Sequence, residues 1–262
     1  MSLLLKLWHS LPLQSRAVIL KPVQRNARIY RWLMLRHADA IDQADGVDGC
    51  LPPAEMRYRV SSSPHADEFV RVGKTCATDI QSALLRIGRD LKSFTQILDF
   101  GCGCGRTLVH MKNLAPEAQF QGTDIDAKAI EWCTTNLPFA TFRLSKEKPP
   151  IDYVGDTFDF IYVISVFTHL DEEYQFLWLE ELRRIAKPGA ILLVTVHGLD
   201  DNRGFVFERE YEKGLFPAWY QITHHSQEYI YSNFSKYFDV LDYLPRGMNA
   251  HQDVVLLQKR PA

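Results

Sequence analysis

Residues 96–106 read Gln-Ile-Leu-Asp-Phe-Gly-Cys-Gly-Cys-Gly-Arg and decide the fold of this 262-residue chain. The segment begins as a short apolar strand and continues as a loop with glycine at every second position, and a helical pattern starts at Arg106. Glycine has no Cβ, so such a loop can adopt positive φ and let a ligand approach the backbone. A tight strand-to-helix turn needs only one glycine, and three therefore indicate a ligand site.

The glycine spacing separates two kinds of nucleotide ligand. A dinucleotide fingerprint reads G-x-G-x-x-G and places a diphosphate on a helix N-terminus. Here the third glycine, Gly105, comes one residue early, and Arg106 stands in its place. Asp99, just before the loop, suits a cationic ligand better than a diphosphate. Asp124 follows the next strand and can accept hydrogen bonds from both hydroxyls of a ribose. The pattern favours S-adenosylmethionine over a nicotinamide dinucleotide.

Strands and helices alternate from Gln96 onward. Nearly continuous apolar strands joined by helices are typical of a parallel sheet covered on both faces. The last two strands lie about ten residues apart, too close for a crossover, so they are expected to form an antiparallel hairpin. We expect an α/β fold with a doubly wound, mostly parallel seven-stranded sheet. Its strands are expected at residues 96–100, 118–123, 140–144, 158–164, 190–196, 238–243 and 253–258.

The remaining segments divide the chain into an extension and a main domain. Residues 1–65 are expected to be an N-terminal helical and loop extension, with helical spacing over residues 13–37. Residues 66–262 are expected to form the main domain, which opens with a helix near residues 66–90. An insertion around 200–235 is rich in aromatic side chains, which either form a lid over a small acceptor or simply cover the sheet.

Composition and charge exclude several classes of protein. With 46% hydrophobic and 24% charged residues, the chain is neither disordered nor fibrous. No run reaches the ~18 apolar residues that span a bilayer. Residues 1–38 contain seven basic residues and no acid, which leaves the remainder with a net charge of −9. An acidic body argues against nucleic acid as a partner, whereas the basic arm suggests a peripheral contact with an anionic surface such as lipid.

The number and spacing of the cysteines indicate whether a metal site or disulfides are expected, and in which cellular compartment the protein works. The five cysteines include one close pair, Cys102 and Cys104, and no second pair at zinc-ligand spacing. Neither a metal site nor a disulfide framework is therefore expected. Lys6 interrupts the apolar start of the chain, so a secretory signal is not expected either. These observations together predict a cytoplasmic protein.

Four motifs resemble those of the class I S-adenosylmethionine-dependent methyltransferases. Residues 97–106 resemble the first motif, and residues 122–126 (Gly-Thr-Asp-Ile-Asp) resemble the second. Residues 158–170 resemble the motif around the fourth strand, and residues 182–190 the stretch before the fifth. The resemblance covers roughly residues 94–200. It implies a Rossmann-like methyltransferase fold, S-adenosylmethionine as cofactor and S-adenosylhomocysteine as product.

The resemblance also implies roles for individual residues. Asp99 is expected near the methionine amino group, Asp124 on the ribose hydroxyls and Ile125 against the adenine. Ser145 stands where many relatives place a polar contact to adenine. The full set of expected cofactor-binding residues is Asp99, Gly101, Cys102, Gly103, Gly105, Arg106, Asp124, Ile125, Ser145, Ile164, Ser165 and Arg59.

Arg59 in that set comes from a separate resemblance. Residues 51–73 look like the upstream segment of a bacterial subgroup that is often linked with cell-surface glycan and natural-product pathways. This likeness suggests that Arg59 or Tyr58 folds over the cofactor carboxylate. The alternative is a basic residue in a solvated loop.

Histidine is the expected base for an oxygen nucleophile. His169 follows the fourth strand and His197 ends the fifth, and the carboxyl ends of adjacent strands border the ligand crevice in this architecture. The His224-His225 pair in the insertion is a further candidate. A deprotonated amine or a carboxylate acceptor would need no base. The fourth strand is not followed by an Asn-Pro-Pro-Tyr tetrapeptide, which disfavours methylation of nucleobase nitrogens.

The sequence therefore predicts a methyltransferase that acts on a small-molecule or glycan-type acceptor by in-line displacement. Two alternatives stay open. One is an NAD(P)-dependent oxidoreductase of Rossmann type, which the glycine spacing disfavours. The other is a non-catalytic S-adenosylmethionine-binding partner protein, because the sequence identifies several candidate bases and fixes none.

Overall fold

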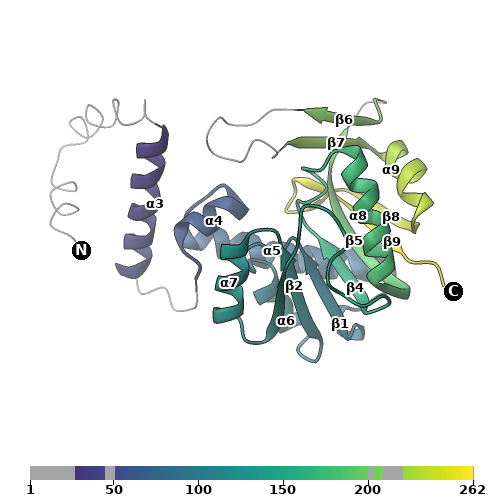
Figure 1. Ribbon diagram of the computed structural model, residues 1–262, viewed down its shortest axis with the longest axis horizontal. Helices are drawn as coiled ribbons and strands as arrows, with labels where there is room; N and C mark the ends of the chain where they lie inside the picture. Colours follow the sequence, from purple (N-terminus) through teal and green to yellow (C-terminus); the bar gives the residue numbers. More distant parts are fainter. Residues whose placement is uncertain (1–26, 45–50, 200–202, 209–220, 262) are drawn as a thin grey trace. The chain divides into compact units, whose positions relative to one another are not determined.

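The computed structural model describes residues 27–44, 51–199, 203–208 and 221–261 (Figure 1). The chain divides into two compact units, Met1–Val70 and Arg71–Ala262. Most of the basic arm and part of the aromatic insertion lie outside the described residues. No described helix is long and apolar enough to cross a membrane.

The described part of the first unit is helical. It contains α3 (Ala27–Ala44), α4 (Ala54–Ser61) and the first turn of α5 (Ala66–Arg86). The helix predicted over residues 13–37 is seen from Ala27 onward, and its earlier residues lie outside the description.

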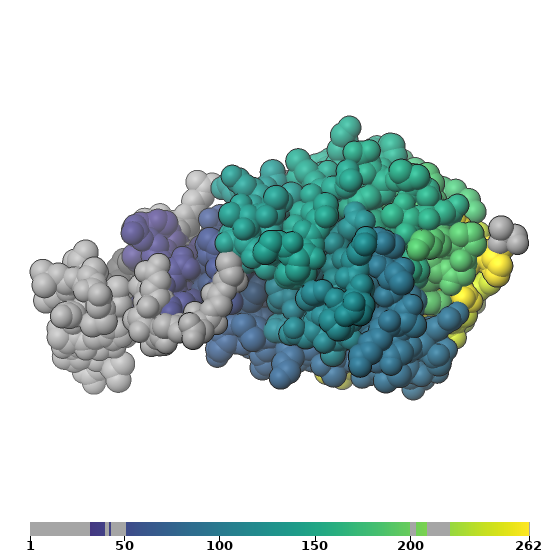
Figure 2. All heavy atoms as spheres, turned by 90° about the horizontal axis from the view of Figure 1, so that it is seen from below, coloured from purple at the N-terminus to yellow at the C-terminus, as the bar shows by residue number. Residues whose placement is uncertain are grey.

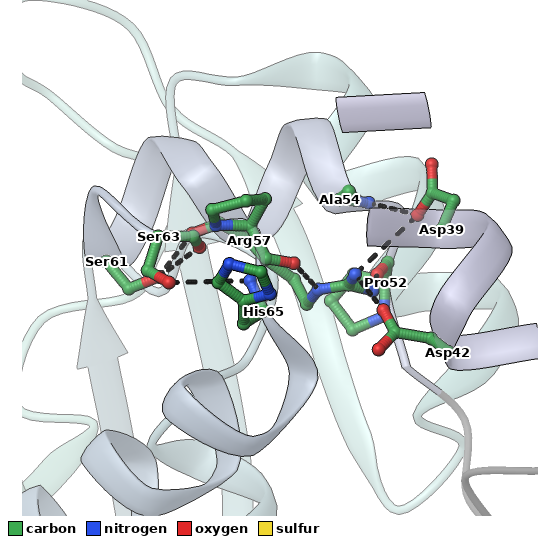
Figure 3. Close-up of polar contacts among 9 residues, drawn as sticks. Asp39, Asp42, Pro52, Ala54, Arg57, Ser61, Ser63 and His65 are labelled. Carbon is green, nitrogen blue, oxygen red and sulfur yellow. Dashed lines mark hydrogen bonds and ion pairs between the residues drawn. The ribbon is translucent and has the colours of Figure 1, made fainter. Parts of the chain in front are cut away.

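Arg57 of α4 makes polar contacts with several segments of this unit, and its side chain is only 2% exposed (Figure 3). Its Nη1 donates to the carbonyl of Pro52 at 2.6 Å, and its Nε donates to the carbonyl of Pro64 at 2.7 Å. The guanidinium also pairs with Asp42, and Asp39 accepts from the backbone N–H of Ala54 at 2.7 Å. A buried guanidinium is tolerated only when it is paired and hydrogen-bonded. These contacts therefore fix α3, α4 and the following turn together.

The second unit is built on a nine-stranded sheet. All seven expected strands are present, and β6 and β7 of the insertion add two more. The strand order is β3-β2-β1-β4-β5-β7-β6, with β9 on β5 and β8 on β9. The strands are β1 (Gln96–Phe100), β2 (Gln119–Asp124), β3 (Ala140–Leu144), β4 (Phe158–Val163), β5 (Ala186–Leu199), β6 (Phe205–Glu208), β7 (Ile222–Ser226), β8 (Asp239–Met248) and β9 (Gln252–Gln258).

Strand β5 pairs with three other strands of this sheet, β4, β7 and β9. It pairs in parallel with β4 along its first part and antiparallel with β9 over Ile191–Val196. Its last residues, His197–Leu199, pair in parallel with β7. The end of β5 therefore lies beside the insertion as well as beside the predicted C-terminal hairpin of β8 and β9.

Helices cover both faces of the sheet and create two apolar clusters. Adjacent residues of β1 point to opposite faces, with Ile97 in one cluster and Leu98 in the other, as the twofold period of a strand requires. Trp178 and Leu182 of α8 pack with Leu98, whereas Ile80 of α5 packs with Ile97. Figure 2 shows side chains from the first half of the unit, coloured blue to teal, over most of one face. The other helical segments are η1 (Leu91–Ser93), α6 (Leu108–Leu114), α7 (Ala127–Asn136), α8 (Glu172–Ile185), α9 (Gln227–Asn233) and η2 (Phe234–Lys236).

Candidate active site

A cavity of about 330 Å³ lies at the carboxyl ends of the first four strands. The strand order reverses at β1, which neighbours both β2 and β4, and ligands of open α/β sheets bind at such a reversal. Six of the predicted site residues meet there. The complete lining is Phe100, Gly101, Asp124, Ile125, Ser145, Lys146, Glu147, Ser165, Val166, His169, Leu170, Asp171, Tyr174, Trp178, Phe207 and Gln221.

The glycine loop borders this cavity through Gly101. Gly101 has a φ of +80°, and a Cβ built there would lie 2.3 Å from Cγ2 of Val166. Gly105 has a φ of +76°, and its Cβ would lie 2.5 Å from Cδ1 of Leu137. Real Cβ atoms do not approach that closely, so both positions require glycine for conformation and for space. The loop therefore presents backbone rather than side chains to a ligand.

Asp124 joins the glycine loop to the end of β2. Its carboxylate accepts from the backbone N–H of Gly103 at 2.8 Å and from that of Asp126 at 2.8 Å. Burial raises the pKa of Asp124, and these N–H donors oppose the shift. The N-cap of α7 is Asp126, whose side chain accepts from the N–H groups of Lys128 and Ala129. Because Asp126 caps the helix, Asp124 is available to face the cavity, and each carboxylate oxygen can accept more than one hydrogen bond.

Asp99 is buried near the loop and is not among the residues that line the cavity. The hydroxyl of Tyr162 donates to its Oδ2 at 2.8 Å. Burial raises the pKa of Asp99 to about 7, and Asp124 adds to this, while Tyr162 and Arg106 oppose it. A cation bound nearby would favour the ionised carboxylate. Asp99 therefore suits the role that the sequence predicted, beside an amino group or a sulfonium.

Ser165, at the end of β4, is held in a left-handed conformation with a φ of +58°. Its N–H donates to Oγ1 of Thr195 on β5 at 2.8 Å, and Nε2 of Gln252 on β9 donates to its Oγ at 2.8 Å. Such strain in a residue other than glycine is typical of functional sites, where the surrounding structure imposes it. Three strands thus fix one edge of the cavity.

His169 is the candidate base that lines the cavity. Its Nδ1 lies 2.6 Å from the backbone carbonyl oxygen of Gln221. A carbonyl only accepts, so Nδ1 carries the proton of the neutral ring and Nε2 is the basic nitrogen. Burial lowers the pKa of His169 from its usual value of 6.5. The imidazole is therefore uncharged at neutral pH and able to accept a proton.

His197 lies outside the cavity lining, in a cluster with other imidazoles. Its ring centroid is 5.3 Å from that of His224 and 5.6 Å from that of His251. Burial and the neighbouring histidines lower the pKa of His197 to about 4. His225 is fully buried, with Nε2 2.8 Å from Oε1 of Gln175 and a pKa lowered to about 3 by burial. Neither ring is charged at neutral pH.

The remaining predicted residues lie around the cavity or in the first unit. Cys102, Gly103 and Gly105 complete the loop, and burial raises the pKa of the Cys104 thiol to about 12. Arg106 acts electrostatically on Asp99. Ile164 is half-buried against the cluster on the α5 face. Arg59 belongs to α4 of the first unit. Among the described residues, no group of three or more His, Cys, Asp or Glu could hold a metal ion.

Sequence reasoning missed most of the aromatic lining. Tyr174 and Trp178 lie four residues apart on one face of α8, and both pack in the apolar cluster on that side of the sheet. They also border the cavity, which periodicity alone cannot show. Phe207 was included only in the general aromatic character of the insertion. Gln221 carried no signal, because a lone polar residue before a short strand has no distinctive pattern.

Comparison with known families agrees with this geometry. Residues 98–192 match the family model described as a methyltransferase domain. Residues 98–192 are therefore a methyltransferase domain. The match begins in β1 and ends in β5, so it contains the glycine loop, Asp124 and His169.

Relatives of the methyltransferase domain extend the comparison. The probable thiol methyltransferase 2 of Arabidopsis thaliana is 29% identical over 129 residues, which are 46% of this chain and 56% of that protein. The chain spans about half the length of the curated relatives that it matches, 56% and 43% for the two at hand.

Solved structures show the same fold. A 1,6-didemethyltoxoflavin-N1-methyltransferase from Burkholderia thailandensis, solved with S-adenosylhomocysteine and 1,6-didemethyltoxoflavin, has a TM-score of 0.56 at 15% identity. The superposition covers 79% of this chain and 88% of that one. A SAM dependent methyltransferase from Aquifex aeolicus has a TM-score of 0.53 at 17% identity, covering 80% of this chain and 100% of that one.

Proposed function

We propose that the chain is an enzyme that transfers the methyl group of S-adenosylmethionine to a small-molecule or glycan-type acceptor by in-line displacement. The observation that carries this proposal is one cavity in which the glycine loop, a ribose-type carboxylate and a neutral histidine meet. The match of residues 98–192 to a methyltransferase domain supports the same conclusion.

The residues of the cavity fit S-adenosylmethionine. Asp124 would accept the ribose hydroxyls, Ile125 would contact the adenine and Ser145 would bond its polar edge. Gly101 leaves the space that a Cβ would fill, and Asp99 would stabilise the amino group of the methionine moiety. When bound, S-adenosylmethionine supplies an electrophilic methyl group on a sulfonium. The protein would orient the two reactants and accept one proton from the acceptor.

We assign the proton transfer to His169 rather than His197, because His169 lines the cavity. The acceptor oxygen would gain the methyl group and lose its proton to Nε2 of His169, while the electrons of the broken carbon–sulfur bond stay on sulfur. The carbonyl of Gln221 would then stabilise the charged imidazole by accepting its Nδ1–H. This arrangement resembles other sites in which a base is oriented by a second group.

A thiol acceptor is the second candidate, and the similarity to a probable thiol methyltransferase favours it. Thiols ionise near pH 8.5, far below alcohols, and so depend less on a base. Replacement of His169 by glutamine would therefore reduce methylation of a hydroxyl strongly and methylation of a thiol only slightly. The ratio of the two losses identifies the class of acceptor.

Calorimetry of the full chain tests the cofactor assignment. S-adenosylhomocysteine should bind and NAD should not, and Asp124→Ala should abolish the binding because it removes the ribose acceptor. Asp126→Asn is the matched control, since asparagine also caps helices and leaves Asp124 in place. Binding of NAD instead would establish the oxidoreductase alternative. Cofactor binding without methylated product from any acceptor would indicate the non-catalytic partner.

A further inference from the structure

The lining of the cavity has two chemically different parts. The residues at or just after the ends of β2 and β3 are mostly polar, and they are Asp124, Ile125, Ser145, Lys146 and Glu147. The residues from the loop after β4, from α8 and from β6 are mostly apolar. We call five of these the aromatic subsite, namely Val166, Leu170, Tyr174, Trp178 and Phe207. The adenine and ribose contacts proposed above all belong to the first part, so the aromatic subsite is available to the acceptor.

The aromatic subsite adjoins the glycine loop. A Cβ built on Gly101 would lie 2.3 Å from Cγ2 of Val166, so these two residues are in close contact. Val166, His169 and Leu170 are half-buried and all line the cavity. The candidate base therefore lies among the residues of this subsite, on the side of the cavity that meets the loop.

Strand pairing places Phe207 over the residues that follow β4. Phe207 of β6 is the register partner of Thr223 of β7 (Figure 1), and directly opposed residues extend their side chains to the same face of the pair. The Thr223 hydroxyl donates to the carbonyl of Leu170 at 2.8 Å. The face that carries the Phe207 ring is therefore the one turned toward Leu170.

Helix α8 supplies the second accessible ring. Asp171 caps the helix by accepting the N–H of Tyr174 at 2.9 Å, and Nζ of Lys148 lies 5.0 Å from the centroid of the Tyr174 ring. Trp178 is buried against Phe100, with ring centroids 4.9 Å apart. Tyr174 and Phe207, in contrast, are only half-buried. These two rings therefore have surface to offer a ligand, and Trp178 lies beneath them as support.

Few hydrogen-bonding groups accompany these rings. In the described lining, the polar side chains nearest in sequence or pairing are those of His169, Asp171 and Gln221. Asp171 already caps α8, and Oε1 of Gln221 is buried below the surface. A sugar placed here would lose water from several hydroxyl groups without gaining partners for them, which is unfavourable. A flat apolar ring with one hydroxyl group needs only one such partner.

The size of the cavity also favours a compact acceptor. Its volume of about 330 Å³ is at the lower end of the ~300–1,000 Å³ that is typical of ligand pockets. The cofactor would occupy part of this space. A single or fused ring fits the remainder better than a chain of sugar units does.

We propose that the acceptor is an uncharged phenol, whose ring contacts Tyr174 and Phe207 and whose hydroxyl group faces His169. The phenolic oxygen would form a bond to the methyl carbon and lose its proton to Nε2 of His169, while the electron pair of the broken carbon–sulfur bond stays on sulfur. The proposal rests on the methyltransferase function proposed above. It narrows the acceptor to an aromatic small molecule.

A phenol also matches the strength of the candidate base. Phenols ionise near pH 10, as the tyrosine side chain does, whereas alkyl alcohols are much weaker acids. Burial lowers the pKa of His169 and makes it a weaker base than an exposed histidine. Transfer of a proton from a phenol to such a base is less unfavourable than transfer from a sugar hydroxyl.

Calorimetry on the full chain, saturated with S-adenosylhomocysteine, tests the acceptor class with matched probes. We expect 2-naphthol and 4-methylphenol to bind. Their reduced analogues, decahydro-2-naphthol and 4-methylcyclohexanol, keep the hydroxyl group and the size but lose the flat ring, so they should bind about tenfold more weakly. Methyl glucoside should not bind at millimolar concentration. With S-adenosylmethionine instead, mass spectrometry should detect the methyl ether of 2-naphthol, formed about a hundredfold more slowly by His169→Gln.

A pair of variants on β6 tests the contact with the ring. Phe207→Leu keeps an apolar side chain but removes the aromatic one, and it should weaken binding of 2-naphthol about threefold to tenfold. Phe205→Leu is the matched control, because Phe205 lies outside the cavity lining and packs against His225 and Tyr229, each with ring centroids 5.3 Å apart. It should leave the Kd of 2-naphthol unchanged. Both variants should bind S-adenosylhomocysteine as the unmodified chain does.

Four outcomes overturn the acceptor class while the methyltransferase function stands. These are failure of both phenols to bind, equal affinity for the phenols and their reduced analogues, preferential binding or methylation of methyl glucoside, and equal effects of the two β6 variants. Weaker binding of S-adenosylhomocysteine in Phe207→Leu alone would assign the aromatic subsite to the cofactor and would also overturn the proposal. If the unmodified chain does not bind S-adenosylhomocysteine, the proposed function itself fails and the acceptor class fails with it.

Discussion

Burial shifts pKa values in opposite directions on the two sides of the cavity. On the β1–β2 side, burial raises the pKa values of Asp99 and Asp124. On the β5–β7 side, burial lowers the pKa values of His169 and His197. Burial always favours the uncharged form, which is the protonated carboxyl and the deprotonated imidazole.

The two sides differ in how their polar atoms are satisfied. Both oxygens of Asp124 accept backbone N–H donors, and Asp99 accepts the Tyr162 hydroxyl. Nδ1 of His197 and Oε1 of Gln221 have no such partner in the described residues. The carboxylates of the acid side therefore already have hydrogen-bond partners, whereas these two atoms of the histidine side have none in the described residues. This difference predicts that variants on the acid side affect the cofactor and variants on the histidine side affect the acceptor.

The largest effect is expected for Gly101→Ala on the acid side. The new Cβ would clash with Val166 and would also force alanine into positive φ. The loop would have to move out of the cavity, so binding of S-adenosylhomocysteine should fall by more than about a hundredfold, as expected for the loss of roughly 3 kcal/mol.

Gly189→Ala provides the matched control for this loop variant. Gly189 has a φ of +78°, and nothing lies within 4 Å of its Cβ position. This substitution has the conformational cost alone, about 1 kcal/mol of stability, and should leave binding intact. Calorimetry with thermal denaturation measures both effects. Equal loss of binding in the two variants would show that loop stability, not the close approach to Val166, sets the affinity.

The contrast between the two sides also explains what the sequence could predict. The glycine loop, the cap at Asp126 and the strand containing Asp99 are local patterns, because each is encoded within a few consecutive residues. The structure confirms the strand and the turn, and Asp126 caps α7. The six predicted residues that meet in the cavity come mainly from such local signals at strand ends.

The histidine side depends on pairing between distant segments. The contact of His197 with His224 exists only because the end of β5 pairs with β7, and β7 lies in an insertion that showed no strand signal. No periodicity within either segment specifies that register. Sequence reasoning could therefore nominate the histidines individually, but it could not assemble them with Gln221.

A smaller effect is expected for His169→Gln on the histidine side. Loss of the base should lower kcat for a hydroxyl acceptor by roughly a hundredfold, while the Kd for S-adenosylhomocysteine stays unchanged. Steady-state kinetics and calorimetry separate the two effects. Gln175→Met is a useful comparison, since it removes the buried bonds to His225 and to the carbonyls of Phe167 and Leu170, on either side of His169, without removing the base.

The pH profile sharpens the same prediction. Burial lowers the pKa of His169 below 6.5, so the ring remains an uncharged base as the pH falls through that value. The acidic limb of kcat for the unmodified enzyme should therefore lie below pH 6.5 and should be absent in His169→Gln. An acidic limb above pH 6.5 would contradict the assignment of this histidine as the base.

The smallest effect is expected for Tyr162→Phe, which returns to the acid side. The Tyr162 hydroxyl stabilises the ionised form of Asp99, so its removal should raise the carboxyl pKa above its value of about 7. More of the free protein would then be protonated at pH 7, and a cationic ligand would have to displace that proton. Binding of S-adenosylhomocysteine should weaken a few-fold at pH 7 and recover at pH 9, where Asp99 is again ionised.

The number of protons released on ligand binding is the decisive measurement for this variant. Calorimetry in buffers of different ionisation enthalpy should show that Tyr162→Phe releases more protons on binding at pH 7 than the unmodified chain does. Tyr153→Phe is the matched control, because the Tyr153 hydroxyl is buried without a partner in the described residues and does not contact Asp99. Unchanged proton release in Tyr162→Phe would mean that Asp99 does not exchange its proton for the ligand's charge. The acid side would then bind the cofactor through Asp124 and the loop backbone alone.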